Sequence, residues 1–371
     1  MIGASTDDPD SPEQESTRDV IKAALDVCRE YEYPAIVQDY VLCGALDLQY
    51  KVEERHIKQV LDSFADYRDI ILGFFAWDEP LTTHLEDARQ RQEWVRKYDP
   101  DVRLFYNMLP SYGKYTWKDN SYKSYVDDVN RQLDPAMLSV DYYVFYLDSQ
   151  GEPDVLSPTQ ELWKDMGYLR KLCKETGKPF EFYIQGTDVF GGSTPNRIPY
   201  MTAEKLGFQT YAALAYGAKR ISCFTTYGLL LDDNGNKTRL YNDVKELNRE
   251  ALKVGEFLFD KTPDKIYHSG AGSLPAVREQ YFVDDLAQSP LLSEIPSETI
   301  VSTFRDQAGG HYLMIANKDY AFPTEGKLVF KKEQQLYRLN AIAGRLDPLP
   351  APVKSLALNI PAGGYALYKI A

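Results

Sequence analysis

Cysteine and histidine are scarce in this sequence, and neither is spaced for metal binding. The chain contains 4 Cys and 4 His among 371 residues. No cysteines form a CxxC pair and no histidines form an HExxH motif, so we expect neither a zinc site nor a redox motif. We interpret the cysteines as free buried thiols: Cys28, Cys43, Cys173 and Cys223. The sequence implies no metal and no cofactor.

Long apolar runs and an excess of positive charge are also missing. No stretch approaches the roughly 18 apolar residues of a membrane-spanning helix, and residue 1 does not begin a signal peptide. A secreted or periplasmic location would fit if an upstream signal segment had been removed. The net charge of −13 at pH 7 argues against nucleic acid, which needs clustered Lys and Arg. A neutral ligand fits this composition best, and the oligomeric state is not set by the sequence.

Aromatic residues, in contrast, are abundant. They make up 13% of the chain and include 28 Tyr. Tyr and Trp present flat apolar faces with a polar group at the edge, which suits sugar rings. A large Tyr-rich core is the alternative, and composition alone does not choose between the two.

Apolar strands and amphipathic helices alternate along the first 260 residues. The pattern predicts strands over 34–41, 70–80, 102–107, 137–143, 179–185 and 218–227, and helices over 17–31, 52–67, 81–98, 121–133, 159–176, 202–217 and 241–258. Such alternation indicates a parallel sheet with right-handed crossovers. Each strand ends in a polar or aromatic cluster, as in a (β/α)8 TIM-type barrel. A doubly wound open sheet is the rival, but no Gly-rich phosphate loop follows a strand.

Six strands are two fewer than a complete barrel needs. Residues 1–5 could be the tail of a second strand, with further strands upstream; an incomplete barrel is the alternative. After about Thr262 the pattern changes to short alternating strands separated by glycine turns, which predicts an antiparallel β-sandwich. We therefore expect a barrel domain over 1–260 and a β-sandwich domain over 261–371.

The stretch from Ile70 to Pro80 organises the predicted site. It begins as a continuous apolar run, which indicates a strand buried on both faces. It ends in Trp77, Asp78, Glu79 and Pro80, and acids at the carboxyl end of such a strand reach the catalytic face of a barrel. The alternative is that Asp78 caps the following helix, with Glu79 in its first turn.

These strand ends resemble the clan-A retaining glycoside hydrolases, the barrel superfamily of cellulases and β-galactosidases. Residues 77–80 match the end of strand four in that superfamily if two strands are missing upstream. The resemblance then makes Glu79 the general acid/base, with Asp78 in place of the usual Asn. Residues 138–143, 178–186 and 215–227 resemble strands six, seven and eight, so the likeness covers roughly 18–260.

One position departs from the superfamily, because Gln185 stands where strand seven would end in the nucleophilic Glu. An amide cannot form a glycosyl ester, and three interpretations stay open. The second carboxylate could be Asp141 or, next in order, Asp39; a wide gap to Glu79 would then imply inversion. Alternatively, an acetamido group of the substrate assists, or the barrel binds sugar without cleaving it.

We predict a glycosidase that cleaves a neutral oligo- or polysaccharide by general acid/base catalysis. Its alternative is a catalytically inactive carbohydrate-binding barrel. The predicted catalytic residues are Glu79 and Asp141, and the predicted substrate-binding residues are Asp39, Trp77, Asp78, Asn107, Tyr143, Gln185 and Tyr227.

Overall fold

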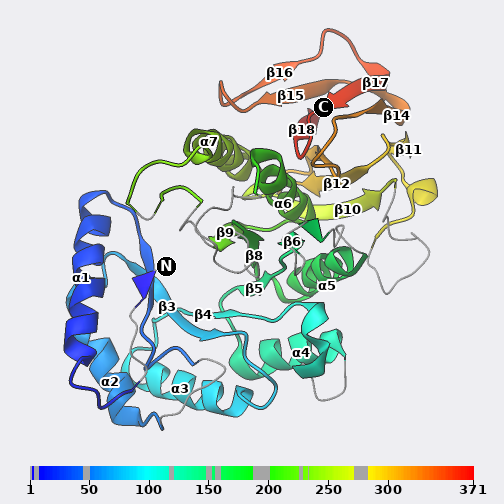
Figure 1. Ribbon diagram of the computed structural model, residues 1–371. Helices are drawn as coiled ribbons and strands as arrows, with labels where there is room; N and C mark the ends of the chain where they lie inside the picture. Colours follow the sequence, from blue (N-terminus) through cyan, green and yellow to red (C-terminus); the bar gives the residue numbers. More distant parts are fainter. Residues whose placement is uncertain are drawn as a thin grey trace. The chain divides into compact units, whose positions relative to one another are not determined.

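The computed structural model describes most of the chain in two units. The described residues are 2–3, 8–44, 51–116, 121–147, 153–154, 160–186, 201–224, 229–232, 234–270 and 283–371. The first unit comprises Met1–Asp141 and the second Tyr142–Ala371. Figure 1 shows the described elements coloured in chain order from blue to red.

The first unit alternates strands and helices. Its elements are β1 (Ile2–Gly3), α1 (Gln14–Glu30), β2 (Ala35–Gln38), α2 (Glu54–Ser63), a 3₁₀ turn (Ala65–Tyr67), β3 (Ile71–Asp78), α3 (Leu85–Tyr98), β4 (Leu104–Asn107), a 3₁₀ segment (Ser111–Thr116), α4 (Tyr122–Leu133) and β5 (Leu138–Asp141). β1 to β4 pair in chain order in one parallel sheet. Helices α2 and α3, and then α3 and α4, pack as neighbours (Figure 1).

The sheet of the first unit places its polar strand ends at one level. Gly44 forms a parallel bridge to Trp77, and Asp78 lies opposite Asn107 in the ladder between β3 and β4. A further bridge joins Met108 to Val140, which brings the end of β5 beside the end of β4. Glycine is required at position 44, because a Cβ there would lie 2.1 Å from the Trp77 ring.

Helix ends in the first unit follow local rules. The Ser121 side chain caps α4 by accepting a hydrogen bond from the backbone N–H of Ser124, 3.3 Å away. Helix α3 begins only at Leu85, after a turn, with His84 at its N-cap. Asp78 is therefore not the cap of that helix, and the alternative interpretation of this acid is wrong.

The second unit first continues the β/α pattern. Its elements are β6 (Tyr146–Leu147), β7 (Pro153–Asp154), α5 (Gln160–Thr176), β8 (Phe180–Gln185), α6 (Ala203–Tyr216), β9 (Arg220–Phe224) and α7 (Tyr241–Leu258). β8 and β9 are parallel. Thr202 caps α6, which ends at Gly217 in the left-handed conformation, φ 97°. Nearly every side chain of α6 is buried, so this helix is part of the core.

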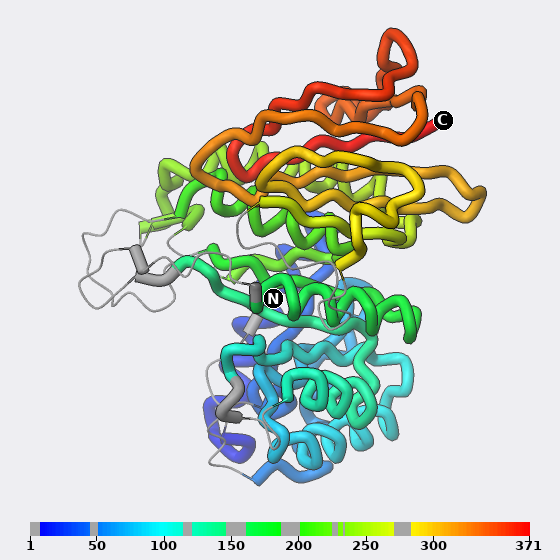
Figure 2. The backbone as a smooth tube through the Cα atoms, turned by 90° about the vertical axis from the view of Figure 1, so that its right-hand side faces the viewer, coloured from blue at the N-terminus to red at the C-terminus, as the bar shows by residue number. Residues whose placement is uncertain are grey.

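Antiparallel strands fill the rest of the second unit. They are β10 (Thr262–His268), β11 (Leu292–Glu294), β12 (Thr299–Arg305), β13 (His311–Asn317), β14 (Thr324–Gln334), β15 (Leu336–Asn340), β16 (Arg345–Pro348), β17 (Val353–Ile360) and β18 (Tyr365–Ile370). One sheet has the order β10-β12-β13-β18-β15-β16 and the other β11-β14-β17. Side chains of both sheets share one apolar core, including Val301, Leu313, Phe330 and Ile360. Figure 2 shows these strands side by side in yellow to red.

The predicted fold class is confirmed: a parallel β/α region resembling part of a TIM barrel precedes antiparallel β-sheets. Residues Ile2 and Gly3 pair in parallel with β2, as expected for the tail of a preceding strand. The four cysteines are free, although only Cys43 is fully buried. A domain boundary near residue 260 stays a prediction.

Candidate functional site

The carboxyl ends of β3, β4 and β5 bring three of the predicted polar residues together. Asp78 and Asn107 are paired in register, and Asp141 follows the residue that bridges to Met108. These strands are apolar and buried along their length, so their polar ends meet at the edge where pairing stops. The first unit alone therefore assembles a polar cluster.

Glu79 holds a strained backbone at this edge. Its φ is 47°, in the left-handed region that non-glycine residues rarely adopt. The strain costs about 1–3 kcal/mol, and such residues gather at functional sites. The backbone N–H of Glu79 donates to the carbonyl oxygen of Asn107 at 2.9 Å, which helps to hold the turn. Because the turn interrupts the strand, Asp78 and Glu79 need not point to opposite faces.

Glu79 and Asp141 form a pair of hydrogen-bonded carboxyl groups. The pKa of Glu79 is raised to about 7: burial is the largest cause, the negative charge of Asp78 adds to it, and the hydrogen bond with Asp141 lowers it. Two carboxyl groups can share a hydrogen bond only if one holds a proton. Because this hydrogen bond lowers the pKa of Glu79, it favours the ionised form of Glu79, with Asp141 as the donor.

Asp78 is oriented by a short relay of side chains. Ser139 Oγ donates to Asn107 Oδ1 at 3.1 Å, and Asn107 Nδ2 donates to Asp78 Oδ1 at 3.3 Å. Crowding by protein atoms raises the pKa of Asp78, and the bond from Asn107 lowers it. The Asp78 side chain nevertheless keeps exposed surface, so water still screens its charge. Asp78 thus faces outward while Asn107 and Ser139 lie beneath it.

The contact between Glu79 and Asp141 is closer than the carboxyl separation of either class of glycosidase. Retaining enzymes separate their two carboxyl groups by about 5–5.5 Å, and inverting enzymes by about 6.5–9.5 Å. A direct hydrogen bond between Glu79 and Asp141 brings them closer than either. Asp141 is only 3% exposed.

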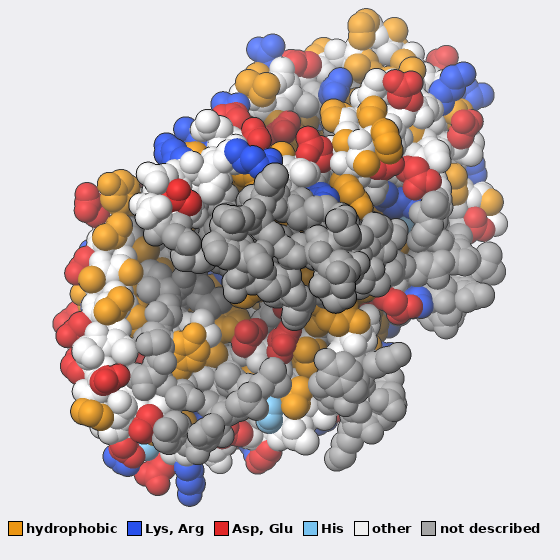
Figure 3. Space-filling model, viewed as in Figure 1, with side chains coloured by type: hydrophobic (Ala, Val, Ile, Leu, Met, Phe, Trp, Pro, Cys, Tyr) orange, Lys and Arg blue, Asp and Glu red, His pale blue; other side chains and the backbone are white. Residues whose placement is uncertain are grey.

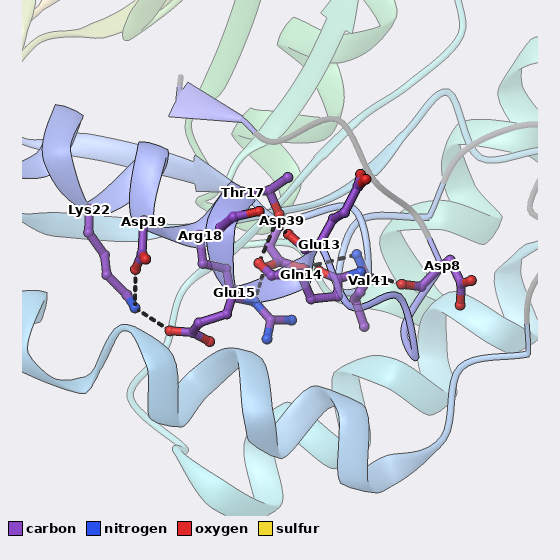
Figure 4. A network of polar contacts seen from close by, with 11 residues as sticks. Asp8, Glu13, Gln14, Glu15, Thr17, Arg18, Asp19, Lys22, Asp39 and Val41 are labelled. Carbon is purple, nitrogen blue, oxygen red and sulfur yellow. Dashed lines mark hydrogen bonds and ion pairs between the residues drawn. The ribbon is translucent and has the colours of Figure 1, made fainter.

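Two predicted binding residues are part of the core. Trp77 is 1% exposed; the Arg91 guanidinium lies 5.1 Å from its ring, and the ring centroid of His84 lies 5.4 Å away. A ring covered in this way offers no face to a sugar. Asp39, also 1% exposed, accepts a bond from Arg18 Nε at 2.8 Å and one from the Val41 N–H at 3.0 Å (Figure 4). Asp39 therefore fastens α1 to the end of β2.

Gln185, in the second unit, is fully occupied by backbone groups. Its Oε1 accepts from the N–H of Phe145 at 2.8 Å, and its Nε2 donates to the carbonyl oxygen of Phe145 at 2.5 Å. The Gln185 side chain is completely buried. An amide can satisfy both groups of Phe145, whereas a carboxylate has no donor for the carbonyl. Glutamine at this position therefore has a structural role in the described structure.

Two predicted sugar-binding residues remain, Tyr143 and Tyr227. Tyr143 is 7% exposed, and its ring centroid lies 5.8 Å from that of Phe224 in the second unit. Tyr227 lies outside the described residues. Both stay predictions as sugar-binding residues.

Sequence reasoning missed two tyrosines near the carboxyl groups. Tyr40, half-buried, directly follows Asp39, and the charge of Asp78 contributes to raising its pKa. Burial is the main cause of the raised pKa of Tyr125 on α4, and the charges of Glu79, Asp141 and Asp78 add to it. Tyr40 stands at a strand end and was therefore detectable by the rule applied to its neighbours. Tyr125 lies within a helix and carries no such signal.

Metal-binding groups, membrane helices and surface charge can each be assessed over the described residues. Within the described ranges, no group of three His, Cys, Asp or Glu side chains is placed to hold a metal ion. Across the same ranges, no helix combines the length and apolarity needed to cross a membrane. On the face shown in Figure 3, acidic and basic side chains are interspersed, and the described residues form no continuous basic area there.

Comparisons with known proteins give structural neighbours only. No protein-family model and no curated protein matches the sequence. A candidate α-galactosidase from Bacteroides fragilis aligns with a TM-score of 0.51 at 10% identity, over 96% of this chain and 64% of that one. A GH27 β-L-arabinopyranosidase from Geobacillus stearothermophilus aligns with a TM-score of 0.43 at 12% identity, over 88% of this chain and 64% of that one. A GH51 arabinofuranosidase from Xanthomonas axonopodis aligns with a TM-score of 0.47 at 12% identity, over 94% of this chain and 77% of that one.

These neighbours bear on the fold and leave the activity open. The chain spans 64% of the length of the Bacteroides and Geobacillus proteins. Identity of 10–13% among such neighbours shows a shared fold alone. The Bacteroides structure, with a TM-score above 0.5, therefore shares its fold with this chain, and membership of clan A stays a prediction.

Proposed function

We propose that this protein is a glycoside hydrolase acting on a neutral carbohydrate, with Glu79 as the general acid. The observation that carries the proposal is the Glu79–Asp141 pair at the carboxyl end of a parallel β/α sheet. A group that donates a proton near neutral pH works best when its pKa lies near that pH. Burial beside Asp78 brings the pKa of Glu79 to about 7.

In the proposed reaction, Glu79 gives its proton to the glycosidic oxygen as the bond from that oxygen to the anomeric carbon breaks. Water adds to the anomeric carbon and gives a proton to the carboxyl pair, which restores the protonated acid for the next turnover. Asp141 is the second group of the pair, and its hydrogen bond with Glu79 fixes the position of the Glu79 carboxyl group. Asp78, held by Asn107, is the residue we assign to a sugar hydroxyl, because its side chain is exposed beside Glu79.

The test compares three proteins: the wild type, E79Q, and the control E30Q, which changes an exposed glutamate near the end of α1. Each is assayed against aryl glycosides and neutral oligosaccharides. We expect E79Q to lower turnover of substrates with poor leaving groups by about 10²–10⁴-fold. Dinitrophenyl glycosides need little help from an acid, so E79Q should lose far less activity with them. E30Q should match the wild type.

Binding separates the enzyme from a sugar-binding barrel. E79Q should retain the wild-type affinity for oligosaccharides in calorimetry while turnover falls. A wild-type protein that binds these sugars and cleaves none of them would contradict the proposal and favour the non-catalytic alternative. Equal turnover by E79Q and the wild type would remove Glu79 from the mechanism.

A further inference from the structure

We propose that Tyr125 is a positioning residue for Glu79: its hydroxyl locks the strained turn that aims the Glu79 carboxyl group. This inference rests on the proposed function for its catalytic meaning. Its structural content, a fixed orientation of Glu79, can be tested without any substrate.

The geometry around Tyr125 supports this role. Its hydroxyl donates to the carbonyl oxygen of Pro80 at 2.9 Å and accepts from the backbone N–H of Leu109 at 3.2 Å. Pro80 immediately follows Glu79, and Leu109 lies two residues beyond the end of β4. One buried hydroxyl from α4 therefore joins the segments that follow two adjacent strands.

The strained residue lies between fixed points. Before it, the Glu79 N–H donates to the carbonyl oxygen of Asn107 at 2.9 Å. After it, the carbonyl oxygen of Pro80 accepts from the Tyr125 hydroxyl. A left-handed glutamate persists only where its surroundings determine its conformation. Loss of the hydroxyl would leave the Pro80 carbonyl and the Leu109 N–H in a buried region without this partner, and the turn would be free to relax.

Relaxation of the turn would change how strongly Glu79 holds its proton. The titratable groups that face Glu79 are Asp78 on β3, Asp141 on β5 and the Tyr125 phenol on α4. If the carboxyl group moves outward, water solvates it and the main cause of its raised pKa weakens. The same displacement would misplace the proton relative to a bound sugar.

The experiment uses Y125F with Y106F as its matched control. Tyr106, on the adjacent β4, is 2% exposed, and its hydroxyl has no hydrogen-bond partner among the described residues. Carboxyl ¹³C NMR, assigned with E79Q, follows the titration of Glu79. We expect Y125F to lower the pKa of Glu79 from about 7 by about one unit and Y106F to leave it unchanged. A folded Y125F with an unchanged Glu79 titration overturns the proposal.

Kinetics give a second readout if the protein cleaves sugars. Y125F should lower kcat about tenfold with KM within about twofold, and it should move the pH limb set by Glu79 downward. A variant that is merely less stable would keep the wild-type kcat and the wild-type position of the pH limb. If the wild type cleaves nothing, the proposed function fails, while the NMR titration still decides the role of Tyr125.

A double variant covers the case in which Y125F does not fold. Glycine adopts the left-handed conformation without strain, so E79G removes what Tyr125 is proposed to hold. We expect E79G/Y125F to fold and to differ from E79G less than Y125F differs from the wild type. Failure of both Y125F and E79G/Y125F to fold would make Tyr125 a general packing residue and overturn the proposal.

Discussion

The ends of β3 to β5 and the pair β8–β9 use the same kinds of polar residues in opposite ways. At the first, Glu79 shares a proton with Asp141, and Asp78 keeps exposed surface beside them. At the second, neighbouring protein groups pair with the charge of Glu181 and use the hydrogen-bonding groups of Gln185. The residue type therefore does not reveal the role, and the partners do.

The β8–β9 pair shows how partners remove reactivity. Glu181 is 1% exposed and accepts bonds from Arg220 Nε, at 2.9 Å, and from Ser222 Oγ. Gln185 is bound to both backbone groups of Phe145, and its own backbone pairs with Gln209. The charge of a buried carboxylate is compensated by an Arg partner, and removing that partner leaves the charge unpaired. The acid at Glu79 has carboxyl neighbours in place of an arginine, so its proton is exchangeable.

The largest effect is expected when the partner of Glu181 is removed. R220A leaves a buried carboxylate without its cation, which should lower the free energy of unfolding by about 3 kcal/mol. Urea unfolding at pH 7 measures the change. The control R29A removes an arginine that pairs with Asp69 on the exposed surface, where we expect little change. Equal losses in the two variants would mean that burial does not distinguish these pairs.

The next effect concerns Gln185. Q185E places a carboxylate against the carbonyl oxygen of Phe145, so we expect a loss of about 2 kcal/mol at pH 8. The new carboxyl group should have a raised pKa, because only its protonated form can donate to that carbonyl. Stability should therefore be retained at pH 5 and lost as the pH rises. Q59E, an exposed change on α2, should show no such dependence in urea unfolding.

The smallest expected effect is the pH dependence of stability that Glu79 causes at the ends of β3 to β5. The folded pKa of Glu79, about 7, exceeds its ordinary value of 4.5. Stabilisation from this group is therefore complete below about pH 4.5 and is lost as the pH rises through 7. Relative to E79Q, the wild type should lose about 1–2 kcal/mol of unfolding free energy between pH 4.5 and 8. A constant difference across that range would place Glu79 in water with an ordinary pKa.

Much of the fold was predictable because it follows from local patterns. Apolar strands alternating with amphipathic helices predicted the parallel region, and short alternating runs with glycine turns predicted the antiparallel sheets. Helix boundaries were less accurate: α3 begins four residues after the predicted start, because a turn stabilised by His84 separates it from β3. Periodicity does not register such a turn.

The candidate site was predictable only in part. The position of Asp78, Asn107 and Asp141 at strand ends follows from where apolar runs stop. Trp77 and Asp39 stand at equivalent positions, yet one packs against Arg91 and the other pairs with Arg18. Arg91 and Arg18 lie on helices, and the sequence does not state which strand end a helical arginine reaches.

The sequence by itself determined the alternation of strands and helices, the change to antiparallel strands and the strand-end position of the acids, since these depend on neighbouring residues. Only the tertiary structure decided which acid keeps a proton. The hydrogen bond between Glu79 and Asp141, the amide bridge of Gln185 and the reach of Tyr125 to Pro80 join residues 40 or more positions apart. The free energy of a proton on a carboxyl group depends on such partners and on burial, and neither is written in the local sequence.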